Sequence, residues 1–174
     1  MEELRALLQP WYLHFKFVHL FMVAMWSFST AVAYRNYILP AFHAWQRNPA
    51  DEAVLAVRNR SMENFDRGAV LEHFAFPFVL LSGLAMVWLA GWNWQSVNWL
   101  TLKLAIVLVI FLPIETVDYY ISHMGGNKRR IRLAGDMDRY ETMVRFHWRF
   151  FRVTTPLIVV FVPLAFYLAV TKPL

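Results

Sequence analysis

The chain has 174 residues, of which 59% are hydrophobic and 17% aromatic, with a formal net charge of +5 and no cysteine. This apolar share, with a mean hydropathy of +0.39, exceeds what a soluble domain of this length needs for its core, so the surplus is expected to face lipid. The lack of cysteine excludes disulfides and thiolate metal sites. The basic residues flank apolar segments and form no basic-aromatic module, which argues against a nucleic-acid partner.

Four apolar stretches, each of about 20 residues, predict helices that can cross the ~30 Å hydrocarbon core of a bilayer. They cover residues 11–34, 70–92, 99–120 and 150–170. We therefore predict an all-α integral membrane protein, a single transmembrane domain over residues 1–174 that forms a four-helix bundle.

The connection before the second span contains a helix-start signal. Asn48 and Pro49 precede Asp51 and Glu52, the order of an N-cap residue, a proline in the first turn and acids at the positive end of a helix. We expect a helix to begin at Asn48 and Pro49 and to continue through Gly68 into the second span, as a cytoplasmic helical extension.

The charge of the connections predicts the orientation. Residues 91–98 carry no formal charge, whereas residues 35–67 hold five Lys or Arg and residues 121–152 hold eight. The positive-inside rule places the two basic segments in the cytoplasm and both termini outside it, as for a protein of the bacterial inner membrane.

Two local signals refine this picture. Trp92, Trp94 and Trp99 are spaced as an interfacial aromatic belt, which is typical of the membrane–water boundary. Glycines at 125 and 126 are expected to end the third helix, and the KRRIR cluster that follows, at 128–132, suits anionic lipid headgroups.

Ionisable side chains inside apolar spans are costly, so each is a candidate functional group. In the first span His19 shares a helix face with Trp26. In the second span Glu72 and His73 are neighbours, about 100° apart, and we expect only one of them to face the interior. In the third span the spacing of Glu115 and Asp118 places them on one face, together with residues 119 and 122.

The fourth span opens with a stripe of arginines, Arg145, Arg149 and Arg152, at i, i+4 and i+7, and His147 points away from it. Two interpretations of the stripe stay open. It pairs with buried carboxylates such as Glu115, or its planar guanidinium groups hold the carboxylates of a ligand, for example porphyrin propionates.

The histidines of the predicted cytoplasmic half suit two kinds of cofactor. One is haem b, held between axial ligands on facing helices. The other is a divalent metal ion held by histidines and carboxylates, with Glu72 as a further carboxylate. The candidate ligands for either cofactor include His73, His123 and His147, and those for the metal ion add Glu115 and Asp118.

Several segments resemble the HemJ-type protoporphyrinogen IX oxidases. The run YLHFKFVHLFMVAMW resembles their first helix, FPFVLLSGLAMVWL their second, WLTLKLAIVLV their third, and RFFRV with TKPL the start and end of their fourth. The segment 48–67 and LPIETVDYY are also similar to an uncharacterised family of four-helix membrane proteins related to copper-resistance D domains. The first resemblance implies haem b, oxidation of a porphyrinogen and electron transfer to the respiratory chain, with His19, Lys103, Arg149 and Arg152 at matching positions.

We carry two hypotheses for the function. In the first, the chain is a haem-b-binding oxidoreductase that takes a porphyrinogen or another hydrophobic substrate from the bilayer and passes electrons to a respiratory quinone or another electron-transfer partner. His19, Lys103 and Glu115 are its candidate catalytic residues, with His19 or Glu115 moving protons. In the second, it is a non-catalytic protein that handles a metal or haem through a His/carboxylate site. Both hypotheses are compatible with a homo-oligomer.

Overall fold

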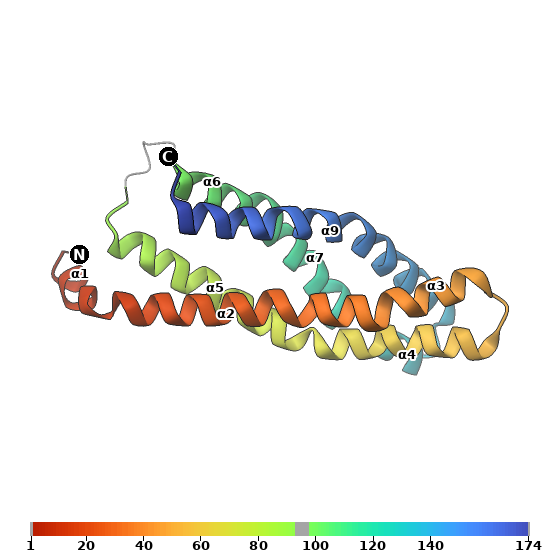
Figure 1. Cartoon of the computed structure of the whole chain (residues 1–174). Coiled ribbons are helices and arrows are strands. Elements are labelled where there is room, and N and C mark those ends of the chain that lie inside the picture. The colour runs from red at the N-terminus through yellow and green to blue at the C-terminus, as the bar shows by residue number, and fades with distance from the viewer. Residues whose placement is uncertain (1, 93–97, 174) are drawn as a thin grey trace.

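The computed structural model describes residues 2–92 and 98–173, apart from the side chain of Ser29. Every regular element of these residues is helical (Figure 1). The elements in chain order are α1 (Glu2–Leu8), η1 (Gln9–Trp11), α2 (Tyr12–Ala33), η2 (Tyr34–Ile38), α3 (Leu39–Arg47), α4 (Glu52–Gly68), α5 (Val70–Leu89), α6 (Trp99–Ile106), η3 (Val107–Phe111), α7 (Leu112–His123), α8 (Lys128–Leu133) and α9 (Met137–Thr171).

These elements join into four helical runs that are long and apolar enough to cross a membrane, judged by length and composition. The runs are Glu2–Arg47, Glu52–Leu89, Trp99–Leu133 and Met137–Thr171. The predicted all-α architecture with four candidate spans is therefore confirmed. Trp94, one member of the predicted aromatic belt, lies outside the described residues.

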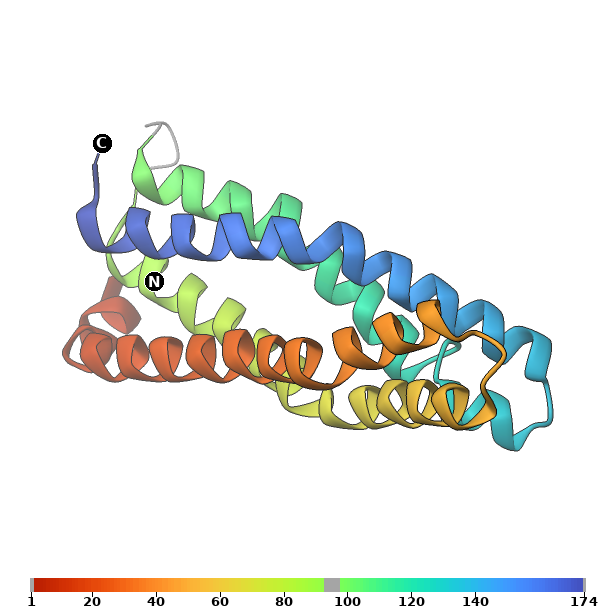
Figure 2. The same cartoon turned by 45° about the vertical axis from the view of Figure 1, so that its right-hand side comes forward.

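The bundle is built from two helix pairs. The first run packs along the second through α2 and α5, and the third packs along the fourth through α6 and α9. Both termini lie at one end of the molecule, while α3, α4 and α8 lie at the opposite end (Figures 1 and 2). This common end for the termini is what an even number of antiparallel passes requires.

Two π-helical turns interrupt the runs, and each lies just ahead of a proline. Segment η2 precedes Pro40 and segment η3 precedes Pro113. A proline ring clashes with the carbonyl group four residues earlier, here on Asn36 and Val109. Both carbonyls belong to the π-helical turns, whose wider backbone provides the room that an α-helix denies.

The helical extension before α5 is confirmed as a helix, but it begins three residues later than predicted. Asp51, and not Asn48, is the N-cap: its carboxylate accepts hydrogen bonds from the N–H groups of Ala53 and Val54, at 2.8 and 3.2 Å. The chain needs the turn at Asn48 and Pro49 to reverse direction between α3 and α4. Only after this turn do free N–H groups at the start of α4 face the Asp51 carboxylate, which accepts from two of them.

The end of the molecule away from the termini has its own core. Phe42, Met62, Tyr140 and Val144 are almost fully buried where α3, α4 and α9 meet. A fully buried Arg58 contacts this cluster. This core explains why α9 begins well before its apolar stretch, because its first turns are held by tertiary packing and not by lipid.

The turn after α7 is closed by Gly126. A Cβ atom at this position would lie 2.8 Å from both Cα and the carbonyl oxygen of Ile121, so only glycine allows the chain to pass this close. The predicted stop of the third helix at these glycines is confirmed, since α7 ends at His123. The turn sends α8 back against α4, which brings Lys128 into the interior.

Candidate functional site: a His/carboxylate cluster

The central polar cluster lies between α5 and α7. Glu72 and Glu115 are 4% and 5% exposed, and the side chain of His73 is equally buried. The expectation that only one of Glu72 and His73 faces the interior is wrong. Both side chains are long enough to reach the cluster from adjacent positions of α5.

Three atoms of this cluster are buried and have no hydrogen-bond partner among the described residues: Glu72 Oε2, His73 Nε2 and Glu115 Oε2. Buried polar groups are nearly always paired, so three orphans in one place require an explanation. Ligand atoms of the same three residues lie within 4.8 Å of one another, and the separation of His73 Nε2 and Glu115 Oε2 is 4.0 Å. An ion with ligand distances of about 2.0–2.2 Å holds its ligand atoms roughly 3–4 Å apart.

The second nitrogen of His73 has a partner that fixes the ring. Its Nδ1 lies 2.9 Å from Nε2 of His123. When Nδ1–H donates to His123, the other nitrogen of His73 is left with a lone pair directed toward the carboxylates. Metal-binding histidines are held in this way by a hydrogen bond at the ring nitrogen that does not bind the ion. His123 therefore lies behind His73 and supports it.

A chain of hydrogen bonds through Asp118, His147, Lys128 and Asp66 adjoins this cluster. Asp118 Oδ1 lies 2.9 Å from Nε2 of His147, and its Oδ2 lies 3.4 Å from Nε2 of His73. The ammonium group of Lys128 donates to Nδ1 of His147 and to Oδ1 of Asp66 at 2.7 Å. Since Lys128 can only donate, Nδ1 of His147 accepts and its Nε2–H donates to Asp118. Both nitrogens of His147 are thus used.

Buried acidic side chains outnumber buried basic ones in the cluster and the adjoining hydrogen-bond chain taken together. Among the described residues of this region, four carboxyl groups are buried, those of Asp66, Glu72, Glu115 and Asp118, against one buried ammonium group, that of Lys128. Uncompensated buried carboxylates are costly, so Glu72 and Glu115 need either a bound proton or an additional cation.

Trp26 of α2 holds Glu115 in place. Its indole Nε1–H donates to Glu115 Oε1 at 2.7 Å, and its ring packs against Phe76 and Phe111. One oxygen of Glu115 is therefore fixed by protein, and the other is free for a ligand.

A cavity of about 260 Å³ adjoins the cluster between α2 and α9. It is lined by Glu72, Glu115 and Asp118 on one side and by apolar side chains of α9 on another. Trp26 lines this cavity and also a smaller one of about 80 Å³, which His19 and Lys103 line together. His19 Nδ1 lies 3.1 Å from both the Val79 carbonyl and Ser82 Oγ.

The arginine stripe lies elsewhere. Arg149 and Arg152 are exposed, and Arg145 pairs with Glu141 on its own helix at 2.7 Å. The interpretation that the stripe pairs with Glu115 or another buried carboxylate is therefore wrong for Arg145. The stripe faces away from the bundle because His147, on the opposite side of α9, occupies the interior. A role of Arg149 and Arg152 toward ligand carboxylates stays a prediction.

Sequence reasoning missed Asp66 and Lys128. Lys128 was expected in a headgroup-binding cluster, and the structure instead buries it completely. Its neighbours 129, 130 and 132 do lie on the surface or near it. The available signal was weak: Lys128 follows a Gly-Gly turn, where a chain that folds back can carry one side chain inward.

No family model, no curated protein and no solved structure matches this chain. The resemblance to protoporphyrinogen oxidases therefore stays a prediction, and the function has to be argued from the site itself.

Proposed function

We propose that the chain is an integral membrane protein that binds one divalent transition-metal ion through Glu72, His73 and Glu115. The observation that carries this proposal is the convergence of their three unpartnered, buried ligand atoms. An ion with two positive charges would neutralise two carboxylates and satisfy all three atoms at once.

The donor set narrows the choice of metal. One imidazole and two carboxylates, with no thiolate in the chain, suit borderline or hard ions such as Zn²⁺, Fe²⁺ or Mn²⁺ and do not suit Cu⁺. Asp118 lies next to this set and accepts a hydrogen bond from His147, but the ligand atoms that all lie within 4.8 Å of one another are those of Glu72, His73 and Glu115. We therefore assign Asp118 to the supporting hydrogen bonds and not to the ion.

The adjoining cavity favours a site that exchanges a ligand over a closed structural site. Three protein ligands leave one or more coordination positions free, which is the pattern of zinc sites that bind a water or a substrate. The cavity of about 260 Å³ borders Glu72 and Glu115 directly. A small molecule in it could contact the ion without displacing a protein ligand.

The haem hypothesis finds less support in this geometry. Axial ligands hold the iron between them, so their nitrogens must stand apart with the metal in the gap. His73 and His123 are instead in direct contact at 2.9 Å, and both nitrogens of His147 are hydrogen-bonded. These three histidines do not fit a haem in the described arrangement.

The proposed placement has four membrane spans, with α3, α4 and α8 in the cytoplasm and both termini outside it, in a bacterial inner membrane. The basic residues gather at the end with α3, α4 and α8, which the positive-inside rule assigns to the cytoplasm. The metal site then lies within the bundle toward its cytoplasmic side.

Metal titration of the detergent-purified, chelator-treated protein tests the proposal. We expect one Zn²⁺ or Co²⁺ per chain by calorimetry, and a Co²⁺ absorption spectrum of nitrogen and oxygen ligation without thiolate bands. Glu72→Gln, Glu115→Gln and His73→Ala should each weaken binding by at least tenfold. Affinity should fall as the pH is lowered, because protons compete for the same ligand atoms.

His43→Ala and Glu52→Gln serve as matched controls, since both residues are exposed and lie at the far end of the molecule, away from the cluster. They should bind as the unmodified chain does. A chain that binds no ion, or three site variants that bind it unchanged, would overturn the proposal. A Soret band in the purified protein would instead support the haem hypothesis over the metal-ion proposal.

A further inference from the structure

A small cavity, separate from the metal cluster, lies in the half of the bundle that carries both termini (Figure 1). It has a volume of about 80 Å³ and lies between α2, α5, α6 and α9. His19 and Lys103 line it, and the rest of its described lining is aliphatic or aromatic, with Phe76 and Phe111 among the larger side chains. The cavity is therefore a largely apolar space with two ionisable nitrogen groups in its wall.

The ammonium group of Lys103 has no carboxylate to compensate its charge. It makes no hydrogen bond or ion pair with the residues that the structure describes. A lysine near the membrane surface usually extends its ammonium group into water, but Lys103 lines the cavity instead. Because a cation in an apolar space is costly without a counterion, the cavity favours an anionic occupant.

The ring of His19 is held in one orientation by α5. Its Nδ1 lies 3.1 Å from both the Val79 carbonyl oxygen and Ser82 Oγ, and a Cβ atom at Gly83 would lie 3.2 Å from its Cε1. Since a carbonyl oxygen only accepts, Nδ1 carries the proton and Nε2 of the neutral ring keeps a lone pair. Nε2 has no partner among the described residues. His19 and Lys103 thus supply a free acceptor and a free donor to one cavity.

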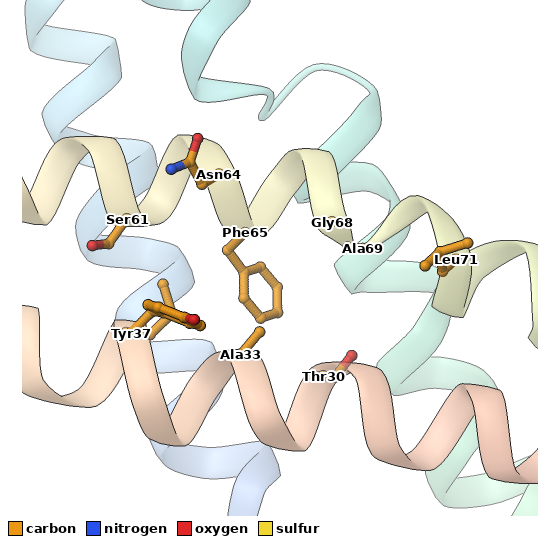
Figure 3. Close-up of a pocket in the computed structure, with 10 residues that line it drawn as sticks. Thr30, Ala33, Tyr37, Ser61, Asn64, Phe65, Gly68, Ala69 and Leu71 are labelled. Atoms are coloured by element: carbon orange, nitrogen blue, oxygen red, sulfur yellow. The ribbon is translucent and has the colours of Figure 1, made fainter.

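The larger hollow between the first and second helical runs has no such groups. It has a volume of about 380 Å³, and Figure 3 shows Thr30, Ser61 and Asn64 among its lining residues. No Asp, Glu, His, Lys or Arg of the described residues lines it. Space and a few hydroxyl or amide groups do not define an occupant there, whereas the uncompensated charge of Lys103 does so in the smaller cavity.

We propose that the small cavity binds the carboxyl group of a monocarboxylic acid. The proton of the acid moves to Nε2 of His19, which then donates to one carboxylate oxygen, and the ammonium group of Lys103 donates to the other. A chloride ion brings no proton and would face the lone pair of His19, so the pair favours an acid over a simple anion. The inference uses no residue of the metal cluster and does not depend on the metal ion.

Two sources supply this chemistry, a short water-soluble acid and a fatty acid of the bilayer. The volume of the cavity leaves room for a carboxyl group and a few carbon atoms. Leu20 and Phe166 line the cavity and are 50% and 42% exposed, so a longer chain could leave between α2 and α9 toward lipid. Butyrate probes the cavity itself, and octanoate probes this exit.

Titration calorimetry of the detergent-purified full chain with sodium butyrate, in two buffers of different ionisation enthalpy, tests the proposal. At pH 7 we expect one butyrate per chain and the uptake of about one proton with it. Affinity should rise as the pH is lowered, because the bound state holds the additional proton. Lys103→Met should weaken binding at least tenfold, and His19→Gln should weaken it and abolish the proton uptake.

Lys16→Met is the matched control, since Lys16 is exposed, lies one turn before His19 and does not line the cavity. It should bind butyrate as the unmodified chain does. Octanoate that binds at least tenfold more tightly than butyrate, and equally depends on Lys103, supports a fatty acid as the occupant. Equal affinity for the two acids supports a short water-soluble acid.

A chain that binds no butyrate would overturn the proposal, as would Lys103→Met that binds it unchanged. Sodium chloride that competes with butyrate at equal concentration would also overturn it, because the site would then accept any anion. Metal binding by Lys103→Met should be unchanged, since Glu72, His73 and Glu115 do not line this cavity. The two proposals can therefore fail separately.

Discussion

The ion pair between Asp66 and Lys128 offers the sharpest test of the interior packing. Lys128 is fully buried and Asp66 is 2% exposed. Lys128 Nζ lies 2.7 Å from Oδ1 of Asp66, and the Lys128 backbone N–H donates to Oδ2 at 3.2 Å. Asp66→Asn keeps the shape and removes the charge, so the ammonium group loses its anionic partner and has only neutral acceptors, including His147 and the Ile121 carbonyl.

An unpaired buried charge of this kind costs about 3–5 kcal/mol in the free energy of unfolding. For a chain of this length that corresponds to a fall in melting temperature on the order of 10 °C. Tryptophan fluorescence during thermal unfolding in detergent measures it.

Arg145→Gln is the matched control. The ion pair of Arg145 with Glu141 has the same N–O distance of 2.7 Å, but the Arg145 side chain is 57% exposed. Exposed i, i+4 pairs contribute only about 0.3–0.5 kcal/mol. If Asp66→Asn costs no more than Arg145→Gln, the described burial of Lys128 is wrong.

The double variant Asp66→Asn with Lys128→Met completes the cycle. Replacing both members of a buried pair is often neutral or even stabilising, whereas removing one is not. We therefore expect the double variant to recover most of the stability that Asp66→Asn loses. A double variant less stable than either single variant would show that the two residues do not act on each other.

Three further predictions use other parts of the chain. In the naturally cysteine-free chain, Leu133→Cys, 70% exposed, should react with an impermeant maleimide only from the cytoplasmic side, and labelling from outside would reverse the orientation. Asp51→Ala removes the N-cap of α4 and should cost about 1 kcal/mol of unfolding free energy, measurable by thermal melting against the neutral change Glu52→Gln. Arg149→Lys should change that free energy by less than about 0.5 kcal/mol, because Arg149 is exposed; a larger loss would mean that it has a buried partner.

The four candidate spans could be predicted because they depend only on the composition and length of local segments, and both can be read directly from the sequence. The helical continuation through Gly68 was also predictable, since a single glycine weakens a helix without ending it. The start of α9 at Met137 was not. Its first turns are polar outside and are held by contacts with α3 and α4, and those contacts do not appear in local periodicity.

The candidate site was predictable residue by residue but not as an arrangement. Glu72, His73 and Glu115 attract attention as ionisable groups in apolar spans. Which of them meet depends on the rotation of α5 against α7, and this rotation is set by packing around Trp26 and its neighbours. Lys128 depends on a still less local feature, the close passage of Gly126 over Ile121.

The carboxyl groups of Asp66 and Glu72 are both buried, but only that of Asp66 has hydrogen-bond partners for both of its oxygens. This difference predicts opposite responses when each carboxylate is replaced by its amide. Asp66 is fully paired, so Asp66→Asn should lower stability and leave metal affinity nearly unchanged. Glu72 has a free buried oxygen, so Glu72→Gln should remove metal binding and leave the metal-free protein as stable as before or more stable, because an uncompensated charge disappears. Thermal melting and Zn²⁺ titration on the same two preparations separate the cases. Equal loss of stability in both variants would mean that Glu72 supports the bundle and does not belong to a binding site.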